Sequence, residues 1–84
     1  MRFRIGEKEY RGESAVEVIH ALQRDLLHDQ RLTVRDFLLW SMSELSDRIP
    51  LRELDVSDKL SNETLALNYL YLRDEYGTGE LSDS

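Results

Sequence analysis

The sequence predicts an α+β fold in which an N-terminal β-hairpin is followed by three α-helices, the third helix being central. Three observations indicate this. A glycine turn divides residues 2–11 into two short segments of alternating polarity. Two later segments carry apolar residues at helical spacing, each after a capping residue. The last long segment, residues 62–76, is apolar on two sides and therefore needs cover on both.

Length and composition predict one small domain that gains stability by association. The sequence has 84 residues, which we assign to a single domain over residues 1–76 and a flexible acidic tail over residues 77–84. A domain of this size buries only about 60% of its unfolded surface. The sequence contains no cysteine, which excludes disulfides and thiolate zinc sites. Contact with a partner or a second copy is then the expected source of further burial.

The charge of the chain favours a protein partner over nucleic acid. The formal net charge is −6, and it lies in the second half, since residues 1–43 are neutral overall. Such a chain is a poor ligand for phosphate backbones, and its charge fits either a solvated acidic surface or a surface that meets a basic protein partner. No apolar run approaches the ~20 residues of a membrane span, and the N-terminal residues lack the apolar core of a signal peptide. We therefore expect a cytoplasmic protein without a membrane partner.

Residues 2–11 predict a hairpin with a two-residue type II′ turn at Gly6-Glu7, because that turn places glycine first. The turn fixes the register of the two strands. One face then pairs Phe3 with Tyr10, and the other pairs Arg4 with Glu9. A two-stranded hairpin alone is barely stable in water. It must therefore pack on the helices, pair with another strand, or both.

The first helix is expected over residues 15–28, since Ser14 followed by Glu17 has the form of a capping box. A single apolar stripe faces the core and consists of Ala15, Val18, Ile19, Leu22 and Leu26.

The second helix is expected over residues 34–47, with Thr33 as its cap and Pro50 beyond its end. The inward stripe consists of Val34, Leu38, Ser41, Leu45 and Ile49. Trp40 lies outside this stripe, on the side that carries the acidic residues of the helix. We expect Trp40 to be partly exposed, or to be covered by a neighbouring subunit or by residues 51–60.

The third helix is expected over residues 62–76, with Ser61 or Asn62 as its cap and Gly77 at its end. One apolar side consists of Leu65, Tyr69, Leu72 and Tyr76, and the other of Ala66, Leu67, Leu70 and Tyr71. We assign the first side, together with Trp40, to a partner surface, because tyrosine suits an interface. A two-fold homodimer is the expected arrangement. The alternative is a monomer in which residues 51–60 cover the side of the third helix that would otherwise meet the partner.

The residue patterns predict no catalytic, cofactor or metal site. His20 and His28 are two turns apart on one helix, about 12 Å of rise, which is too far to share a metal ion. No serine lies in a Gly-x-Ser-x-Gly pattern, and no glycine-rich loop suits a phosphate. We therefore expect no enzyme activity.

The glycine-turn hairpin and the capped Val/Ile helix after it resemble the opening of β-grasp sulfur carriers and ubiquitin-like proteins. This resemblance covers about the first quarter of the chain. Such folds continue with further strands and the carriers end in Gly-Gly, whereas this sequence continues as helices and has Asp83-Ser84. No property of that family is carried over.

These observations favour a small, non-enzymatic protein–protein interaction or regulatory module that self-associates. The first alternative is an acidic inhibitor that mimics nucleic acid and occupies a basic site on a partner protein. The second is a helix-turn-helix binder of nucleic acid, with Arg31 and Arg35 at the start of the second helix. The acidic outer side of that helix opposes the second alternative.

Overall fold

The computed structural model describes residues 1–27 and 31–82. It confirms the predicted α+β fold class. The elements in chain order are β1 (Arg2–Ile5), β2 (Lys8–Arg11), α1 (Ala15–Leu26), α2 (Val34–Glu44), a 3₁₀ turn η1 (Leu51–Glu53), α3 (Asn62–Glu75) and β3 (Glu80–Ser82). The end of the first predicted helix at residue 28 lies outside the described residues. The second helix ends at Glu44 rather than at residue 47, because residues 45–48 form turns before Pro50.

The sheet has three antiparallel strands in the order β2-β1-β3. The hairpin register is the predicted one, with Phe3 opposite Tyr10 and Arg4 opposite Glu9. Gly6 has a φ of 60°, the sign that the first position of a type II′ turn requires. The third strand was not anticipated: residues 80–82, which the sequence analysis places in a flexible tail, pair with β1. The central strand is therefore the first one in the sequence.

The two faces of the sheet differ in polarity. Phe3 lies between Tyr10 and Leu81 in the register, and these three residues face the helices. On the opposite face, Arg4 lies between Glu9 and Glu80 and forms an ion pair with Glu80. The hairpin therefore packs against the helices through its apolar face and pairs with a third strand, the two contacts that can stabilise a two-stranded hairpin.

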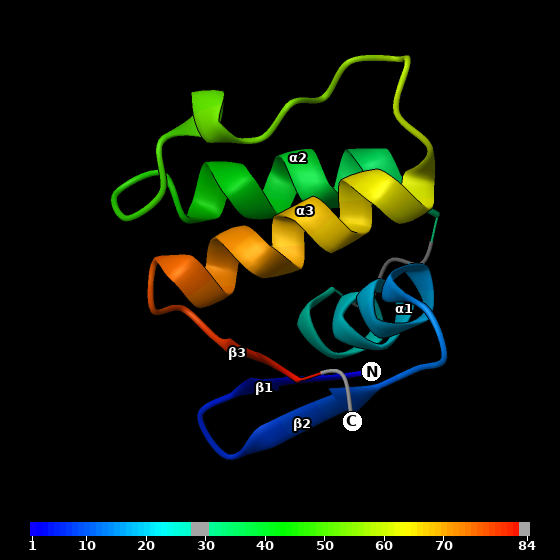
Figure 1. Ribbon diagram of the computed structural model, residues 1–84, viewed down its shortest axis with the longest axis vertical. Coiled ribbons are helices and arrows are strands. Elements are labelled where there is room, and N and C mark those ends of the chain that lie inside the picture. Colours follow the sequence, from blue (N-terminus) through cyan, green and yellow to red (C-terminus); the bar gives the residue numbers. More distant parts are fainter. Residues whose placement is uncertain (28–30, 83–84) are drawn as a thin grey trace.

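Helix α3 occupies the centre of the molecule. Figure 1 shows it between α2 and the sheet, with α1 beside it and packed against β2. Its buried residues form one stripe, made of Leu65, Ala66, Tyr69, Leu70 and Arg73. This corrects the assignment of one whole side to a partner, because Leu65 and Tyr69 are fully buried within the single chain. The inward face lies between the two apolar sides that the sequence suggests.

The predicted helix caps are present, and Ser61 rather than Asn62 is the cap of α3. Ser14, Thr33 and Ser61 each accept a hydrogen bond from the backbone N–H three residues later. A fourth cap comes from another helix, since the Glu63 carboxylate accepts the N–H groups of Ala15 at 2.8 Å and Val16 at 3.0 Å. This contact fixes the start of α3 to the start of α1 and places a carboxylate at a helix N-terminus, where it is stabilising.

Helix α1 departs from its predicted stripe at one position. The first four residues of that stripe, Ala15, Val18, Ile19 and Leu22, are fully buried. Leu26 is 43% exposed, because it is the last helical residue and the chain turns extended at Leu27. Gln23 takes a buried place in the stripe instead, and its amide donates to the Leu32 carbonyl at 3.2 Å.

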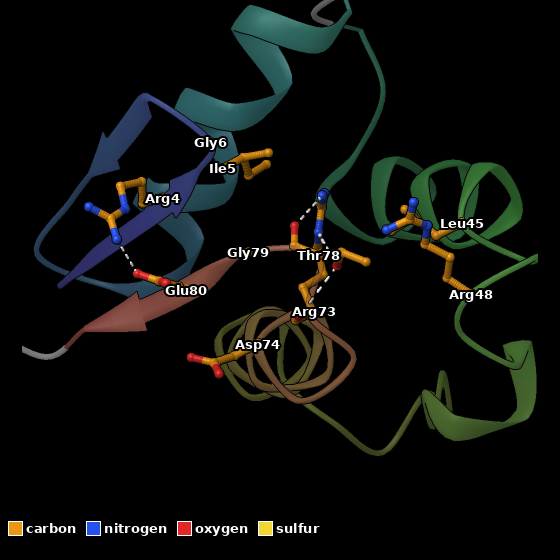
Figure 2. A pocket seen from close by; sticks show the side chains of 11 residues that line it. Arg4, Ile5, Gly6, Leu45, Arg48, Arg73, Asp74, Thr78, Gly79 and Glu80 are labelled. Atoms are coloured by element: carbon orange, nitrogen blue, oxygen red, sulfur yellow. Dashed lines mark hydrogen bonds and ion pairs between the residues drawn. The ribbon is translucent and has the colours of Figure 1, made fainter.

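The end of α3 is a Schellman motif. Gly77, at a φ of 76°, allows its own N–H to bond the Asp74 carbonyl at 3.1 Å and the Thr78 N–H to bond the Arg73 carbonyl at 2.8 Å. The Arg73 side chain then returns to the same residue, with Nε donating to Thr78 Oγ1 at 3.1 Å and Nη2 donating to the Thr78 carbonyl at 2.8 Å. Figure 2 shows this contact at the junction between α3 and β3.

The junction also approaches the central strand closely. The guanidinium of Arg73 lies 5.6 Å from the centre of the Phe3 ring. A methyl group added at Gly79 would lie 2.2 Å from the tip of that ring, a separation that real side chains do not reach. Glycine is therefore required at residue 79 so that the chain can cross Phe3 and enter β3.

Replacing Gly79 with alanine should lower the free energy of unfolding by about 1–3 kcal/mol, because the added methyl group overpacks a filled core. Urea denaturation followed by circular dichroism measures this. The matched control is Ser43→Ala on the exposed side of α2, which should change stability by less than about 0.5 kcal/mol. Equal stability of Gly79→Ala and wild type would contradict the close passage of the chain over Phe3.

Strand β2 is joined to α1 through Asp25. The Tyr10 hydroxyl donates to Asp25 Oδ2 at 2.5 Å, and Lys8 Nζ contacts the same oxygen at 3.0 Å. Burial of the ring, followed by the hydrogen bond to Asp25, raises the pKa of Tyr10 to about 12.

This shift predicts a loss of stability in strong base. The Tyr10 pKa is raised above its ordinary value of 10.0, so the folded chain holds the proton more tightly than the unfolded chain does. The stabilisation is complete below pH ~10 and is lost as the pH rises through about 12. Tm should therefore fall more steeply over this range in the wild type than in Tyr10→Phe, which has no proton to lose. Parallel pH profiles for the two proteins would count against the shift.

Candidate functional site

The outer side of α3 and the 3₁₀ segment enclose a small hollow of about 230 Å³. We call it the acidic hollow. It is lined by Glu53, Asp55, Asn68, Tyr71, Leu72 and Glu75. Two of its carboxylates come from the segment after α2 and one from α3, and an aromatic and an aliphatic side chain line the same hollow.

The carboxylates of the acidic hollow are largely free to meet a partner. Asp55 accepts one hydrogen bond, from the N–H of Ser57 at 2.9 Å. Within residues 1–27 and 31–82, the Glu53 and Glu75 side chains form no hydrogen bond and no ion pair. Surface acids that form no ion pair generate a negative potential that attracts cationic groups.

Tyr71 supplies an aromatic surface in the same place. Its side chain is 52% exposed, although it belongs to the central helix. An aromatic face next to carboxylates is the arrangement that binds a lysine or arginine side chain, since the ring attracts the cation and the acids pair with it. The hollow can therefore hold one cationic side chain of another molecule.

The second wall of the acidic hollow is fixed by Arg35 of α2. Its Nη1 donates to the carbonyls of Val56 at 2.7 Å and Ser57 at 3.3 Å, and its Nη2 donates to the carbonyl of Leu60 at 3.1 Å. Leu54 anchors the same segment in the core and is 5% exposed. Residues 51–60 therefore lie against α2 of their own chain, and the choice between a dimer and a monomer stays a prediction.

The structure divides the five residues assigned to a partner surface. Leu65 and Tyr69 belong to the core, and the Tyr69 hydroxyl lies 2.5 Å from the buried Ser41 hydroxyl. Leu72 is partly buried and lines the acidic hollow. Tyr76 is 37% exposed at the end of α3. Trp40 is partly exposed, as expected, and packs against Phe37 with 5.9 Å between ring centroids.

Sequence reasoning missed Tyr71 as a candidate. It placed this residue on the side of the third helix that faces the domain, together with Ala66 and Leu70. The missed signal is the charge of its neighbours, because Glu75 lies one turn after Tyr71 on the same side of the helix. A tyrosine one turn from an acid is more compatible with the surface than with the core.

The histidines form no site in the described chain. His20 is exposed on α1, and His28 lies outside the described residues. No group of three histidine, aspartate or glutamate side chains suitable for a metal ion occurs within residues 1–27 and 31–82.

Comparisons with known proteins add no family to these observations. No family model, no curated protein and no solved structure matches the chain. In the part of the chain that the structure describes, none of the helices has the length and apolar character needed to cross a bilayer.

Replacing Arg35 with methionine should release residues 51–60 from the helices and open the acidic hollow. The three hydrogen bonds to carbonyls are lost, at a cost of about 1–3 kcal/mol. Trypsin reports on the release directly, because Arg52 and Lys59 lie within the segment and should be cleaved faster. Arg24→Met, on the exposed side of α1, is the control and should leave both cleavage rates unchanged. Unaltered cleavage in Arg35→Met would show that Arg35 does not hold the segment.

Proposed function

We propose that this chain is a non-enzymatic protein–protein interaction module that binds a basic segment of another protein at the acidic hollow. The observation that carries the proposal is the exposed Tyr71 ring beside three carboxylates, two of which have no partner in the described residues. The surplus of acidic residues in the second half of the sequence also favours a basic partner.

Charge favours a basic partner over a second copy at this surface. In a two-fold dimer centred on the acidic hollow, Glu53, Asp55 and Glu75 of one copy would face the same residues of the other. Like charges brought together in this way oppose association. Self-association thus remains a prediction for other surfaces, such as the partly exposed Trp40 and the residues around it.

The two nucleic-acid alternatives differ in their support. The helix-turn-helix alternative needs Arg35 for phosphate contacts, but its guanidinium is engaged with the carbonyls of residues 56–60. The nucleic-acid mimic needs carboxylates that occupy a basic site, and the acidic hollow supplies three. The mimic is therefore a special case of the proposed function, in which the partner is itself a nucleic-acid-binding protein. The cytoplasm stays the expected compartment on sequence grounds alone.

Binding of defined basic peptides tests the proposal. A pool of short random peptides with a fixed central arginine or lysine should perturb the NMR signals of Asn68, Tyr71 and Glu75, and added salt should weaken the effect. The same pool with central glutamate should not. Tyr71→Ser should weaken binding by more than tenfold, the effect expected at an interface hot spot, while unfolding stability stays near wild type because Tyr71 is half exposed.

Two controls make the experiment decisive. Tyr76→Ser changes another partly exposed tyrosine, at the C-terminal cap of α3, that does not line the hollow, and it should leave peptide binding intact. Sedimentation equilibrium of the wild type tests self-association separately. The proposal fails if the basic and acidic pools perturb the same signals equally, or if Tyr71→Ser and Tyr76→Ser behave alike.

A further inference from the structure

A second and larger hollow, of about 630 Å³, lies where α3 ends and β3 begins. We call it the arginine hollow, because Arg4, Arg48 and Arg73 line it together with Asp74 and Glu80. Thr78 and the glycines on either side of it supply a backbone wall. Figure 2 shows that Arg73 comes from α3, Arg48 from the turn after α2, and Arg4 from the sheet.

The two acids of the arginine hollow are already engaged. Glu80 forms an ion pair with Arg4 across the sheet. Asp74 accepts the Leu81 N–H at 2.7 Å. Neither carboxylate forms an ion pair with Arg48 or Arg73 in the part of the chain that the structure describes.

Arg73 is a buried cation whose partners are neutral. The side chain is 6% exposed, and its contacts are the Tyr69 hydroxyl at 3.1 Å, two oxygens of Thr78, and the faces of Phe3 and Tyr69. It forms no ion pair within the described residues. A buried charge is normally paired, and three bonds leave two of the five guanidinium N–H groups without an acceptor.

Arg48 provides a second guanidinium that is not engaged. It is exposed, and its side chain makes no hydrogen bond or ion pair with any residue that the structure describes. Figure 2 shows its side chain on the opposite side of the hollow from Thr78, next to Leu45. Two guanidinium groups that lack a carboxylate thus line one hollow in a chain whose net charge is negative.

We propose that the arginine hollow binds an oxyanion group, a carboxylate or a phosphate, of a small molecule, with Arg48 and Arg73 as its cationic partners. Guanidinium groups bind both anions through paired N–H donors. The anion supplies the counter-charge that Arg73 lacks, and Arg48 closes over it from the opposite side. This inference is independent of the acidic hollow, which has the opposite charge and different lining residues.

Titration with inorganic phosphate and with acetate, each at constant ionic strength set by chloride, tests the proposal. Binding should shift the amide NMR signals of Thr78 and Gly79 and the Arg73 Nε–H signal in a saturable manner. Saturation with phosphate alone assigns the site to phosphate-bearing molecules, and saturation with acetate assigns it to carboxylate-bearing ones. Arg48→Gln should weaken binding about tenfold, as expected for the loss of one charge-assisted hydrogen bond.

The control for charge is Arg52→Gln, which removes an exposed arginine outside the hollow. It should leave the affinity near wild type. Because Arg73 is part of the core, its own signal is followed in the wild type and in Arg48→Gln rather than in a variant that could unfold. NMR shifts that never saturate, or an equal effect of Arg48→Gln and Arg52→Gln on the affinity, would overturn the proposal. Such a result would mean that the anions only screen the surface charge of the protein.

Discussion

The contact between Arg73 and Thr78 is the interaction on which the rest of the structure depends. It ends the central helix, reverses the chain and directs residues 80–82 onto β1. Without that third strand, β1 and β2 would form a two-stranded hairpin, which is barely stable in water. With it, Phe3 lies under the guanidinium of Arg73, at the junction of sheet and helices. One arginine therefore fixes the helical layer to the sheet.

The local features of the fold were predictable because each depends on a few neighbouring residues. The glycine turn determines the register of Phe3 and Tyr10, and three Ser or Thr side chains mark the helix starts. Val34, Leu38 and the polar Ser41 of the predicted inward stripe are also buried, whereas Leu45 lies past the end of α2 and is only partly buried. In each case the signal is a turn residue, a cap or a helical period. Such signals can be identified without knowing which other element of the chain packs against the segment.

The features that escaped prediction are contacts between distant parts of the chain. Around the axis of α3, Arg73 lies in the middle of the buried face, although it belongs to the last turn of the helix. Arginine is a residue type that a sequence argument places at the surface. Because arginine was counted as a polar residue, the single buried stripe was interpreted as two separate apolar sides. Leu65 and Tyr69 were then assigned to a partner surface. The strand at residues 80–82 and the cap from Glu63 likewise depend on partners that lie far away in the sequence. For the candidate site, the partial exposure of Trp40 was predictable and the role of Tyr71 was not.

The two hollows are built on the same pair of elements. Leu72 and Glu75 of α3 line the acidic hollow, while Arg73 and Asp74 line the arginine hollow. The opposite walls also follow one another in the sequence, since Leu45 and Arg48 precede Glu53 and Asp55. Within this stretch Ile49 is fully buried and Leu54 nearly so. These two side chains anchor the stretch against the core. The basic part of the stretch therefore stays beside one part of α3 and the acidic part beside another, although only a few residues separate them.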